Sequence, residues 1–374
     1  MNDFFLKFEF DIIHLFHNQY FYNIQQKELL VSPYSIGICL SYIANLVNSD
    51  KIRHDIIKSF HCNDNTQFSQ FMERVKSIES QVETEYNQDI LKTANILFTD
   101  ISLNDLSEHE IGYLPDIVNF SIMCSTSSMI NRTVKKRTSG RISGLINPFI
   151  NCSRSSFVMS SISLFECEWD SYYKKRFTIA NRTFHGFESK KIVPMIQLNS
   201  EEVLFSCDKT CFAIDLPFSK DEFSLFAIMP KKKSFRAFNK MINGLNQKKF
   251  SYLLNSTKLT RMNVIIPKFT IETDSFNIIN LMERMGIEND LVFTSDRHMH
   301  QLCQKCCFSL TENGAIPIIE HNLEESYSAS KNKKVKSGKY SFKRPFIFFV
   351  VRHNPDIILL SGIIAMPICK ILND

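Results

Sequence analysis

The sequence predicts an α+β fold in which helices and sheets share one hydrophobic core. Apolar residues recur at helical spacing through the first 138 residues. The second half instead carries short runs of aromatic and β-branched residues, each bounded by Pro, Gly or charge. The 374 residues are 44% apolar and contain no Pro- or Gly-rich linker. We therefore expect residues 1–374 to form a single domain with a sizeable core.

The helices are expected in the first part of the chain. The first is indicated by four apolar residues at helical spacing, namely Phe5, Phe8, Ile12 and Leu15. Ser32 with Pro33 opens a second apolar helix, and Ser49 with Asp50 caps a third. Further helical patterns lie at about 66–80, 103–119 and 126–138.

The strands are expected from residue 157 onward. The runs that indicate them occupy 157–159, 192–195, 211–216, 223–228, 263–266 and 346–351. Aromatic and β-branched side chains fit the pleated, half-buried surface of a sheet. Helices that come first and strands that follow favour an α+β or mixed arrangement around one core.

Composition excludes several classes of function. The formal net charge is +5 with a pI near 8.5, which is too weakly basic to indicate a nucleic-acid partner. No run of 18 apolar residues exists, so no membrane span is expected. Charges at Lys7, Glu9 and Asp11 interrupt the apolar region that a signal peptide needs. We expect a cytoplasmic protein, with secretion by a route without a signal peptide as the alternative.

Cysteine and histidine spacing does not predict a metal or catalytic site. The eleven cysteines are odd in number and follow no disulfide-framework spacing, which favours reduced thiols. Two histidines precede three cysteines at His298, His300, Cys303, Cys306 and Cys307. No second pair completes a zinc site, and Cys303 and Cys306 would point to opposite faces of a strand. Cys62 beside His61 lacks an orienting third group, so no catalytic residue, metal or cofactor is expected.

A long polar segment separates two apolar stretches near the C-terminus. Residues 320–341 contain a single Leu and a single Val in 22 residues. A compact domain rarely carries so long a polar connection unless the connection is functional or disordered. Two interpretations follow, a tolerated surface insertion or a displayed recognition loop.

Short motifs along nearly the whole chain occur in an order that is found in one protein family. They are Leu30-Val31-Ser32-Pro33-Tyr34-Ser35-Ile36, the pattern from Ile130 to Ile142, Ser161 through Trp169, Val193-Pro194-Met195, Ile266-Pro267-Lys268-Phe269, Arg344-Pro345-Phe346 and Gly362. In this order and spacing the motifs resemble those of the serpins, a family of protease inhibitors. The residue bias of an AT-rich genome makes intracellular poxviral serpins the relatives that we expect.

The resemblance implies both a fold and a mechanism. The fold would have about nine helices around three β-sheets, with an exposed reactive-centre loop at about 313–341. In this family a protease cleaves the loop and is held as an acyl-enzyme while the loop inserts into the central sheet as an extra strand. The inhibitor supplies stored strain and a bait, with no catalytic residue. The partner would be a host protease of the serine or cysteine class.

The start of the loop departs from the inhibitory pattern. Glu312, Gly314 and Ala315 resemble the family's hinge, which inhibitory members continue with a run of small residues. Here Pro317 and Ile319 follow. Proline has no N–H for a ladder hydrogen bond and is rarely accepted in a central strand. This hinge therefore argues against efficient insertion.

The position of the scissile bond depends on the direction of counting. Family spacing counted forward from Glu312 places it at Ser328–Ala329, which suits an elastase-like protease. Counting back from Pro345 places it near Lys334, which suits a trypsin-like one. The two positions differ by six residues, so the loop is longer than is typical of the family.

A group of polar residues is expected where the central sheet must open. The resemblance assigns Ser32, Ser35, Ser161, Trp169 and Gln304 to this region. Gln304 and Ser161 stand where the family usually has a His and an Asn. Both replacements keep hydrogen-bonding capacity, so the contact beneath the sheet is expected to persist.

Two functions of different classes follow from these observations. The first is a serpin-type inhibitor of a serine endopeptidase, of viral origin and directed at a host protease. The second is a non-inhibitory member of the family that presents its loop or a basic surface to an unidentified protein partner. Family resemblance favours the first, whereas the hinge sequence and the long loop favour the second.

Overall fold

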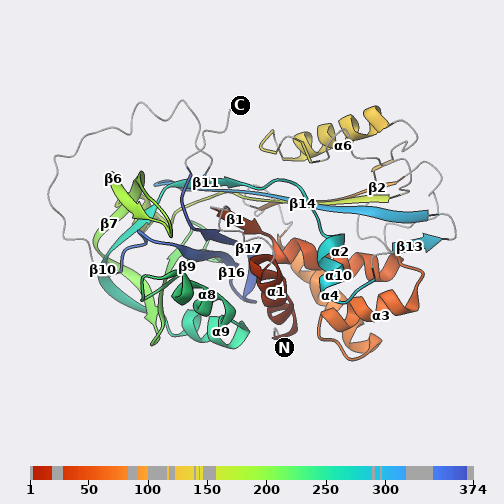
Figure 1. The fold of residues 1–374 in the computed structure, drawn as a ribbon, viewed down its shortest axis with the longest axis horizontal. Coiled ribbons are helices and arrows are strands. Elements are labelled where there is room, and N and C mark those ends of the chain that lie inside the picture. The colour runs from red at the N-terminus through yellow and green to blue at the C-terminus, as the bar shows by residue number, and fades with distance from the viewer. Residues whose placement is uncertain are drawn as a thin grey trace. The chain divides into compact units, whose positions relative to one another are not determined.

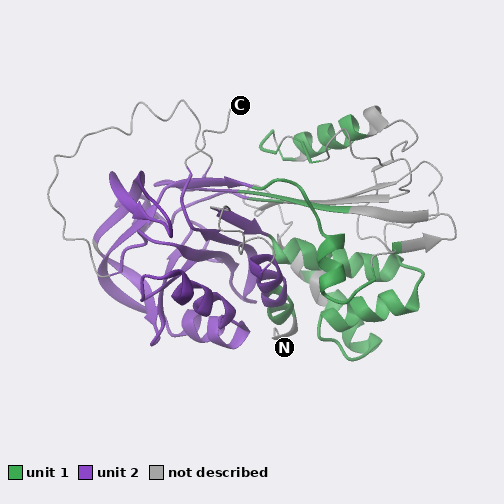
Figure 2. Ribbon diagram, in the orientation of Figure 1, with its two compact units in different colours: residues 1–9, 32–164, 273–307 green, residues 10–31, 165–272, 308–374 purple. Residues whose placement is uncertain are grey.

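Figure 1 shows the computed structural model of the chain, which describes residues 3–18, 28–82, 91–99, 116–117, 123–138, 140–142, 144–145, 157–288, 291–294, 297–316 and 340–368. These residues form two compact units (Figure 2). Unit 1 draws on residues 1–9, 32–164 and 273–307, and unit 2 on residues 10–31, 165–272 and 308–374. The prediction that the chain forms a single domain stays a prediction.

The described residues contain nine helices. They are α1 (Asp3–Phe16), α2 (Pro33–Leu46), α3 (Asp50–Ser59), α4 (Asn65–Val82), α6 (Met123–Arg137), α7 (Ser171–Lys174), α8 (Phe235–Asn243), α9 (Gln247–Asn255) and α10 (Ile279–Arg284). The predicted start of α2 is confirmed, because the Ser32 hydroxyl accepts the N–H of Ser35 and Pro33 occupies the first helical position. Ser49 caps α3 in the same way. None of the described helices combines the length and the apolar character needed to cross a bilayer.

The largest described sheet has eight strands. Along it the order is β1 (Glu28–Val31), β17 (Ile357–Ile364), β16 (Phe346–Arg352), β9 (Phe223–Pro230), β8 (Cys211–Pro217), β7 (Lys190–Cys207) and β10 (Lys258–Pro267), with β6 (Thr178–His185) also paired to β7. Strands β8, β9, β16 and β17 are buried along almost their whole length. Such near-continuous apolar strands form the core of unit 2.

A second sheet has seven described strands. Its order is β11 (Phe269–Glu272), β14 (Arg297–Leu310), β4 (Phe157–Phe165), β2 (Leu91–Thr99) and β3 (Asp116–Ile117), with β12 (Phe276–Asn277) and β13 (Leu291–Thr294) also paired to β14. A third, two-stranded sheet joins β15 (Gly314–Ala315) to β5 (Cys167–Glu168). The expected combination of about nine helices with three sheets is confirmed for the described residues.

The predicted helix at 103–119 is wrong at its C-terminal end. Asp116 and Ile117 form strand β3, which pairs in parallel with Phe98 and Thr99 of β2. The ladder hydrogen bonds of a neighbouring strand outweigh a weak helical pattern. The rest of that predicted helix lies outside the described residues.

Aromatic side chains close the core of unit 1 around α2. The rings of Phe8 and Phe60 lie 4.5 Å apart, and those of Phe60 and Phe71 lie 4.7 Å apart. Gly37 of α2 lets the start of α1 approach closely, because a Cβ at this position would lie 2.9 Å from the ring of Phe5. A side chain at residue 37 would therefore push α1 away from α2.

Phe250 of α9 is central to the core of unit 2. Its ring meets those of Phe10, Phe226 and Phe349 in edge-on contacts, with centroids 5.2–5.4 Å apart. The side chain is completely buried. Edge-to-face pairs add to the apolar area that such a side chain buries, so Phe250 ties α1, α9, β9 and β16 together.

Replacing Phe250 with Ala is expected to destabilise the protein by about 3–5 kcal/mol, because the large cavity left behind cannot collapse among three rigid rings. Tyr252, on the same helix and 61% exposed, supplies the matched control. Tyr252→Ala should change stability by less than about 0.5 kcal/mol. Thermal melts of both variants followed by circular dichroism give the comparison, and equal midpoints would contradict this description of the core.

Candidate functional site

The central position of the seven-stranded sheet is closed by direct pairing of β14 with β4. The two strands run parallel, and eight residue pairs connect them, from Met299 with Phe157 to Cys307 with Leu164. No strand lies between them along these rungs (Figure 1). An inserting strand would have to separate this ladder.

A cluster of buried polar residues lies beneath this ladder in unit 1. The Gln304 amide makes two hydrogen bonds to the backbone of Ser32, accepting from its N–H at 3.1 Å and donating to its carbonyl at 3.0 Å. Ser32 donates its hydroxyl hydrogen to Ser35, whose hydroxyl lies 2.6 Å from that of Ser163. All four side chains are fully buried. We call Ser32, Ser35, Ser163 and Gln304 the sheet-opening cluster.

The structure brings some of the residues predicted for this region into the cluster and leaves others out of it. Ser161 is the backbone partner of Gln304 in the ladder, but its side chain is outside the described part. The hydroxyl that joins Ser35 belongs to Ser163, which the sequence did not single out. Period-two alternation could have found it, because Ser163 lies two residues further along the same face of β4. Gln304 faces the start of α2.

The hinge begins with a tight turn at the end of β14, in unit 2. The N–H and carbonyl of Thr311 bond the carbonyl and N–H of Gly314, at 2.8 and 3.3 Å. Gly314 and Ala315 then pair antiparallel with Glu168 and Cys167 of β5. We call residues 311–316 the hinge. Glu312, Gly314 and Ala315 therefore lie in the turn and strand where the hinge was predicted.

Only glycine fits at residue 314. Its φ is +139°, a conformation that L side chains rarely adopt. A Cβ there would lie 2.2 Å from the carbonyl oxygen of Cys167 and 2.6 Å from the Cα of Glu168. The close approach of the hinge to β5 therefore depends on the missing side chain.

Trp169 holds the turn from the other side. Its indole Nε1–H donates to the carbonyl of Thr311 at 2.9 Å, and its backbone N–H donates to the carbonyl of Asn313 at 3.0 Å. The ring is 1% exposed and stacks on Phe218, with centroids 4.9 Å apart and an interplanar angle of 6°. Trp169 is thus placed at the hinge rather than within the sheet-opening cluster of unit 1.

An ion pair fixes the acidic residue of the turn. The Lys268 ammonium lies 3.0 Å from the Glu312 carboxylate, and their side chains are only 12% and 18% exposed. A partly buried pair is strongly destabilised when one partner is removed, because the other charge stays desolvated. Glu312 therefore helps to hold the turn closed before Gly314.

The remaining predicted site residues lie beyond this point. Pro317, Ile319, Ser328, Ala329 and Lys334 all fall outside the described residues. Their predicted roles at the hinge and at the scissile bond stay predictions.

The thiols of β14 are buried structural groups. Cys303, Cys306 and Cys307 are all buried, and burial raises the pKa of Cys306 far above that of a free thiol. Burial also raises the pKa of Cys62. Within the part of the chain that the structure describes, no three His, Cys, Asp or Glu side chains are grouped to hold a metal ion.

Gln304→Ala is expected to lower stability by about 2–4 kcal/mol, because it removes two buried hydrogen bonds to Ser32 and leaves a small cavity. Asn255→Ala, which removes an exposed amide at the end of α9, is the control and should change stability by less than about 0.5 kcal/mol. Differential scanning calorimetry measures both. A Gln304→Ala midpoint equal to that of the control would show that the cluster does not hold the sheet closed.

Comparison with known proteins gives one consistent result. A family model described as "Serpin (serine protease inhibitor)" matches residues 6–367. The human plasma serine protease inhibitor is 25% identical over 292 residues, which cover 74% of this chain and 69% of that protein. An uncharacterised serpin-like protein of Acanthamoeba polyphaga mimivirus is 21% identical over 364 residues, covering 92% of this chain and 86% of its own.

Solved structures show the same fold. Native protease nexin-1 with heparin superposes with a TM-score of 0.79 at 19% identity, covering 97% of this chain and 99% of that one. A thyroxine-binding globulin complex with thyroxine gives 0.80 at 16% identity, covering 99% and 100%. The expected family and fold are thereby confirmed, while a specifically poxviral relationship stays a prediction.

Proposed function

Because this chain belongs to the serpin (serine protease inhibitor) family, we propose that it inhibits a serine-type endopeptidase by loop insertion. The observation that carries this proposal is the orientation of the hinge. Gly314 and Ala315 run antiparallel to β5, which follows β4 along the chain, while β14 and β4 run parallel to each other. A strand that continues from the hinge and enters between β14 and β4 would run antiparallel to both of them. Gly314 and Ala315 already run in that direction, so the first two residues of the inserting strand have the required orientation.

The register of the hinge predicts where the next residues would enter. Gly314 pairs with Glu168 and Ala315 with Cys167. If an inserting strand continued this antiparallel register by two residues, Pro317 would lie opposite Phe165, the last residue of β4. If the bridge between Gly314 and Thr311 continued in the same way, Pro317 would lie opposite Phe308 of β14. Both sides of the opening therefore give one consistent register.

The same register identifies the hydrogen bond that proline would lose. Successive residues of an antiparallel strand direct their backbone groups to opposite neighbours. Gly314 bonds toward Thr311 on the β14 side, so residue 317 would direct its backbone toward β4. Pro317 has no N–H, and the carbonyl of Phe165 would lose its ladder partner. Ile319, two residues on, adds a larger side chain than the small residues of an inhibitory hinge.

The cost of this mismatch decides how the protein behaves toward a protease. One unpaired carbonyl costs about 1–3 kcal/mol, and a barrier higher by about 1.4 kcal/mol slows insertion tenfold. Trapping is a race between insertion and hydrolysis of the acyl-enzyme. We therefore propose an inhibitor that partitions strongly toward cleaved product, so that a large share of encounters ends without a trapped complex.

The target and the setting belong to the same proposal. A bait at Ser328–Ala329 points to an elastase-like protease, and a bait at Lys334 to a trypsin-like one. We propose a viral protein that acts in the cytoplasm of a host cell on a host protease. The similarity to a mimivirus protein over 92% of the chain supports a viral setting without specifying the host.

A non-inhibitory binding function is the second candidate. The observation that favours it is Pro317, which opposes the one step that trapping requires. Thyroxine-binding globulin, whose complex with thyroxine has a similar fold, illustrates that this fold also serves binding. In that case the loop or another surface would contact a partner protein without being trapped.

Incubating the purified protein with elastase-like and trypsin-like proteases tests the proposal directly. We expect mostly loop-cleaved product, with a minor complex that survives SDS electrophoresis, and sequencing of the new N-terminus distinguishes Ser328–Ala329 from Lys334. Loop-cleaved protein should melt at a clearly higher temperature than intact protein, because the loop has inserted. The absence of both a complex and a rise in melting temperature would exclude inhibition and leave the binding function.

Pro317→Ala isolates the role of the hinge. Restoring the N–H is expected to raise the ratio of SDS-stable complex to cleaved product about tenfold or more, since it lowers the insertion barrier by about 1.4 kcal/mol or more. Ile318→Ala is the matched control, because it trims the loop without restoring a backbone donor. If the two variants partition alike, Pro317 does not limit insertion.

A further inference from the structure

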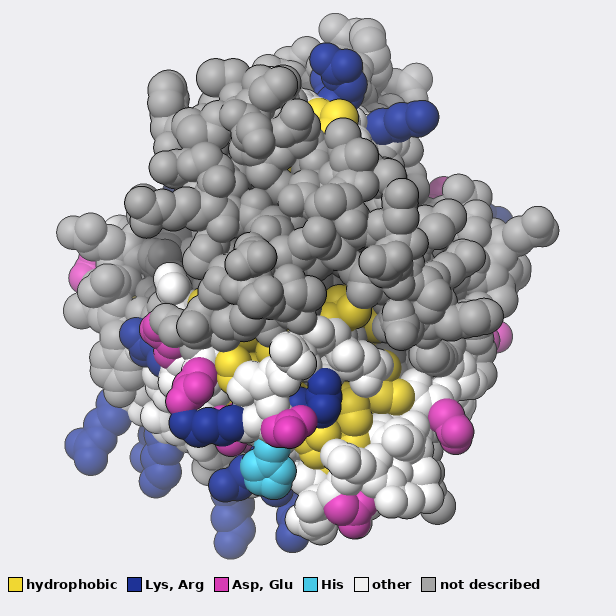
Figure 3. Space-filling model, turned by 90° about the vertical axis from the view of Figure 1, so that its right-hand side faces the viewer, with side chains coloured by type: hydrophobic (Ala, Val, Ile, Leu, Met, Phe, Trp, Pro, Cys, Tyr) yellow, Lys and Arg dark blue, Asp and Glu magenta, His cyan; other side chains and the backbone are white. Residues whose placement is uncertain are grey.

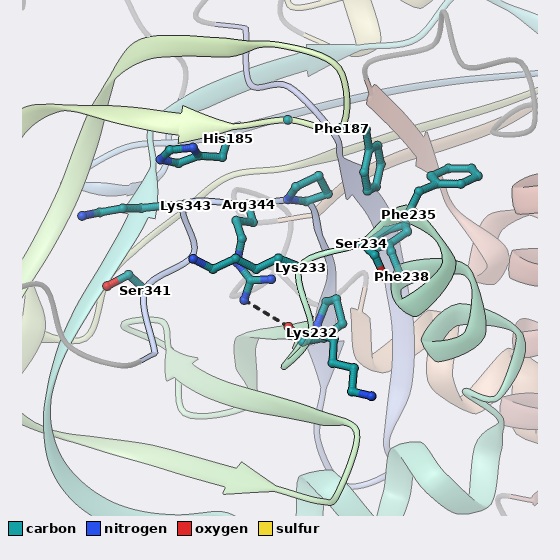
Figure 4. A pocket seen from close by; sticks show the side chains of 13 residues that line it. His185, Phe187, Lys232, Lys233, Ser234, Phe235, Phe238, Ser341, Lys343 and Arg344 are labelled. Carbon is teal, nitrogen blue, oxygen red and sulfur yellow. Dashed lines mark hydrogen bonds between the residues drawn. The ribbon is translucent and has the colours of Figure 1, made fainter.

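We propose that a basic cavity in unit 2 binds a small phosphorylated molecule that carries a flat apolar ring, the chemistry of a nucleoside diphosphate. The cavity has a volume of about 460 Å³, within the range of about 300–1,000 Å³ that is usual for small-molecule sites. Three segments line it, the turn after β6, the start of α8 and the residues that lead into β16 (Figure 4).

One side of the cavity is cationic. Figure 4 shows the side chains of His185, Lys233 and Lys343 on this side, with Arg344 behind them. Lys232 also lines the cavity, although its side chain points away from the others. Of the described residues that form the wall, none carries a carboxylate. An anion would therefore meet several positive groups without a competing negative one.

The positive groups around the cavity repel one another, as is expected of a site that binds an anion. Partial desolvation and the charges of Lys190, Lys233, Lys343 and Arg344 lower the pKa of His185. Burial likewise lowers the pKa of Lys343 and of Arg344. A phosphate group would relieve this repulsion, since it would neutralise groups that are partly removed from water.

The backbone holds the cationic side in place. The N–H of His185 donates to the carbonyl of Lys343 at 2.8 Å, which joins the turn after β6 to the segment before β16. The Arg344 guanidinium donates to the carbonyl of Pro230 at 3.2 Å (Figure 4). Ser234 caps α8, whose first N–H groups add a further positive end. The site is therefore built before a ligand arrives.

The opposite side of the cavity is aromatic. Phe187 packs edge-on against Phe235 and Phe238, with ring centroids 5.0 and 5.4 Å away. Phe187 and Phe235 are only partly buried, whereas Phe238 is fully buried. A purely ionic ligand would leave this wall exposed to water, so the ligand chemistry that fits both sides combines phosphate with a flat apolar ring.

Charges elsewhere on the surface are arranged differently. In the lower part of the face shown in Figure 3, Asp and Glu side chains lie next to some of the Lys and Arg side chains. Helix α3 shows this pattern, because Arg53 pairs with Asp50 at 3.1 Å and Lys51 pairs with Glu288. Such pairs neutralise one another, whereas the ammonium groups of Lys233 and Lys343 have no acidic partner among the described residues.

Isothermal titration of the full chain with ADP, pyrophosphate and adenosine tests the proposal. We expect saturable binding of ADP, with pyrophosphate at least about tenfold weaker because it leaves the aromatic wall uncovered, and adenosine weaker still. No saturable binding of ADP would overturn the proposal. Equal affinities for ADP and pyrophosphate would overturn the aromatic half of it.

Three variants locate the site. Lys343→Gln should weaken ADP binding about tenfold or more, since it removes one charge-assisted contact. Phe187→Leu should weaken binding of ADP but leave that of pyrophosphate unchanged. Lys248→Gln removes the same charge from an exposed position on α9 and should change neither. Equal losses in Lys343→Gln and Lys248→Gln would show non-specific attraction and contradict a site in this cavity. Thermal melts check that each variant is folded.

Discussion

The direct pairing of β14 with β4 is the constraint on which the function of this fold depends. Two parallel strands share one ladder, and a third strand can enter only by separating them. Antiparallel pairs are slightly more stable per residue than parallel ones, so one parallel ladder would be exchanged for two better ladders. On the proposed mechanism, a barrier would hold the closed arrangement, which is then kinetically rather than thermodynamically stable.

The barrier has two separate components, one in each unit. In unit 1, Ser32 serves twice, because its hydroxyl caps α2 while its backbone binds the Gln304 amide. Opening the ladder at this rung would also disturb the first turn of the helix. In unit 2, the turn of the hinge is held by two hydrogen bonds from Trp169 and by the ion pair of Glu312, while Gly314 already lies against β5. Insertion would therefore start at the hinge and slow further along the ladder.

Sequence patterns within one helix or strand predicted the residues whose contacts lie within that element. They missed residues whose partners come from distant parts of the chain. The Ser32-Pro33 start of α2 follows from capping within one element. Strand β3 does not follow from its local pattern, because its partner among the described residues is β2, which lies far from it in the sequence. The basic cavity was missed for the same reason, whereas Ser163 could have been found from the alternation within β4. The cavity joins Lys233 to Lys343, and nothing in either segment alone indicates the other.

The position of the cavity connects its positive charges with the proposed insertion of the loop. Lys343 and Arg344 lie between the polar segment at 320–341 and β16, so on the proposed mechanism they belong to the part of the chain that follows the reactive-centre loop. Like charges held close together and partly out of water destabilise the folded state, and burial alone gives no compensation for them. A bound anion would remove that penalty and strengthen the attachment of residues 341–345 to β6 and α8. The loop would then be anchored more firmly at its C-terminal end than at its hinge. Insertion would start from the hinge end, where the sheet must open.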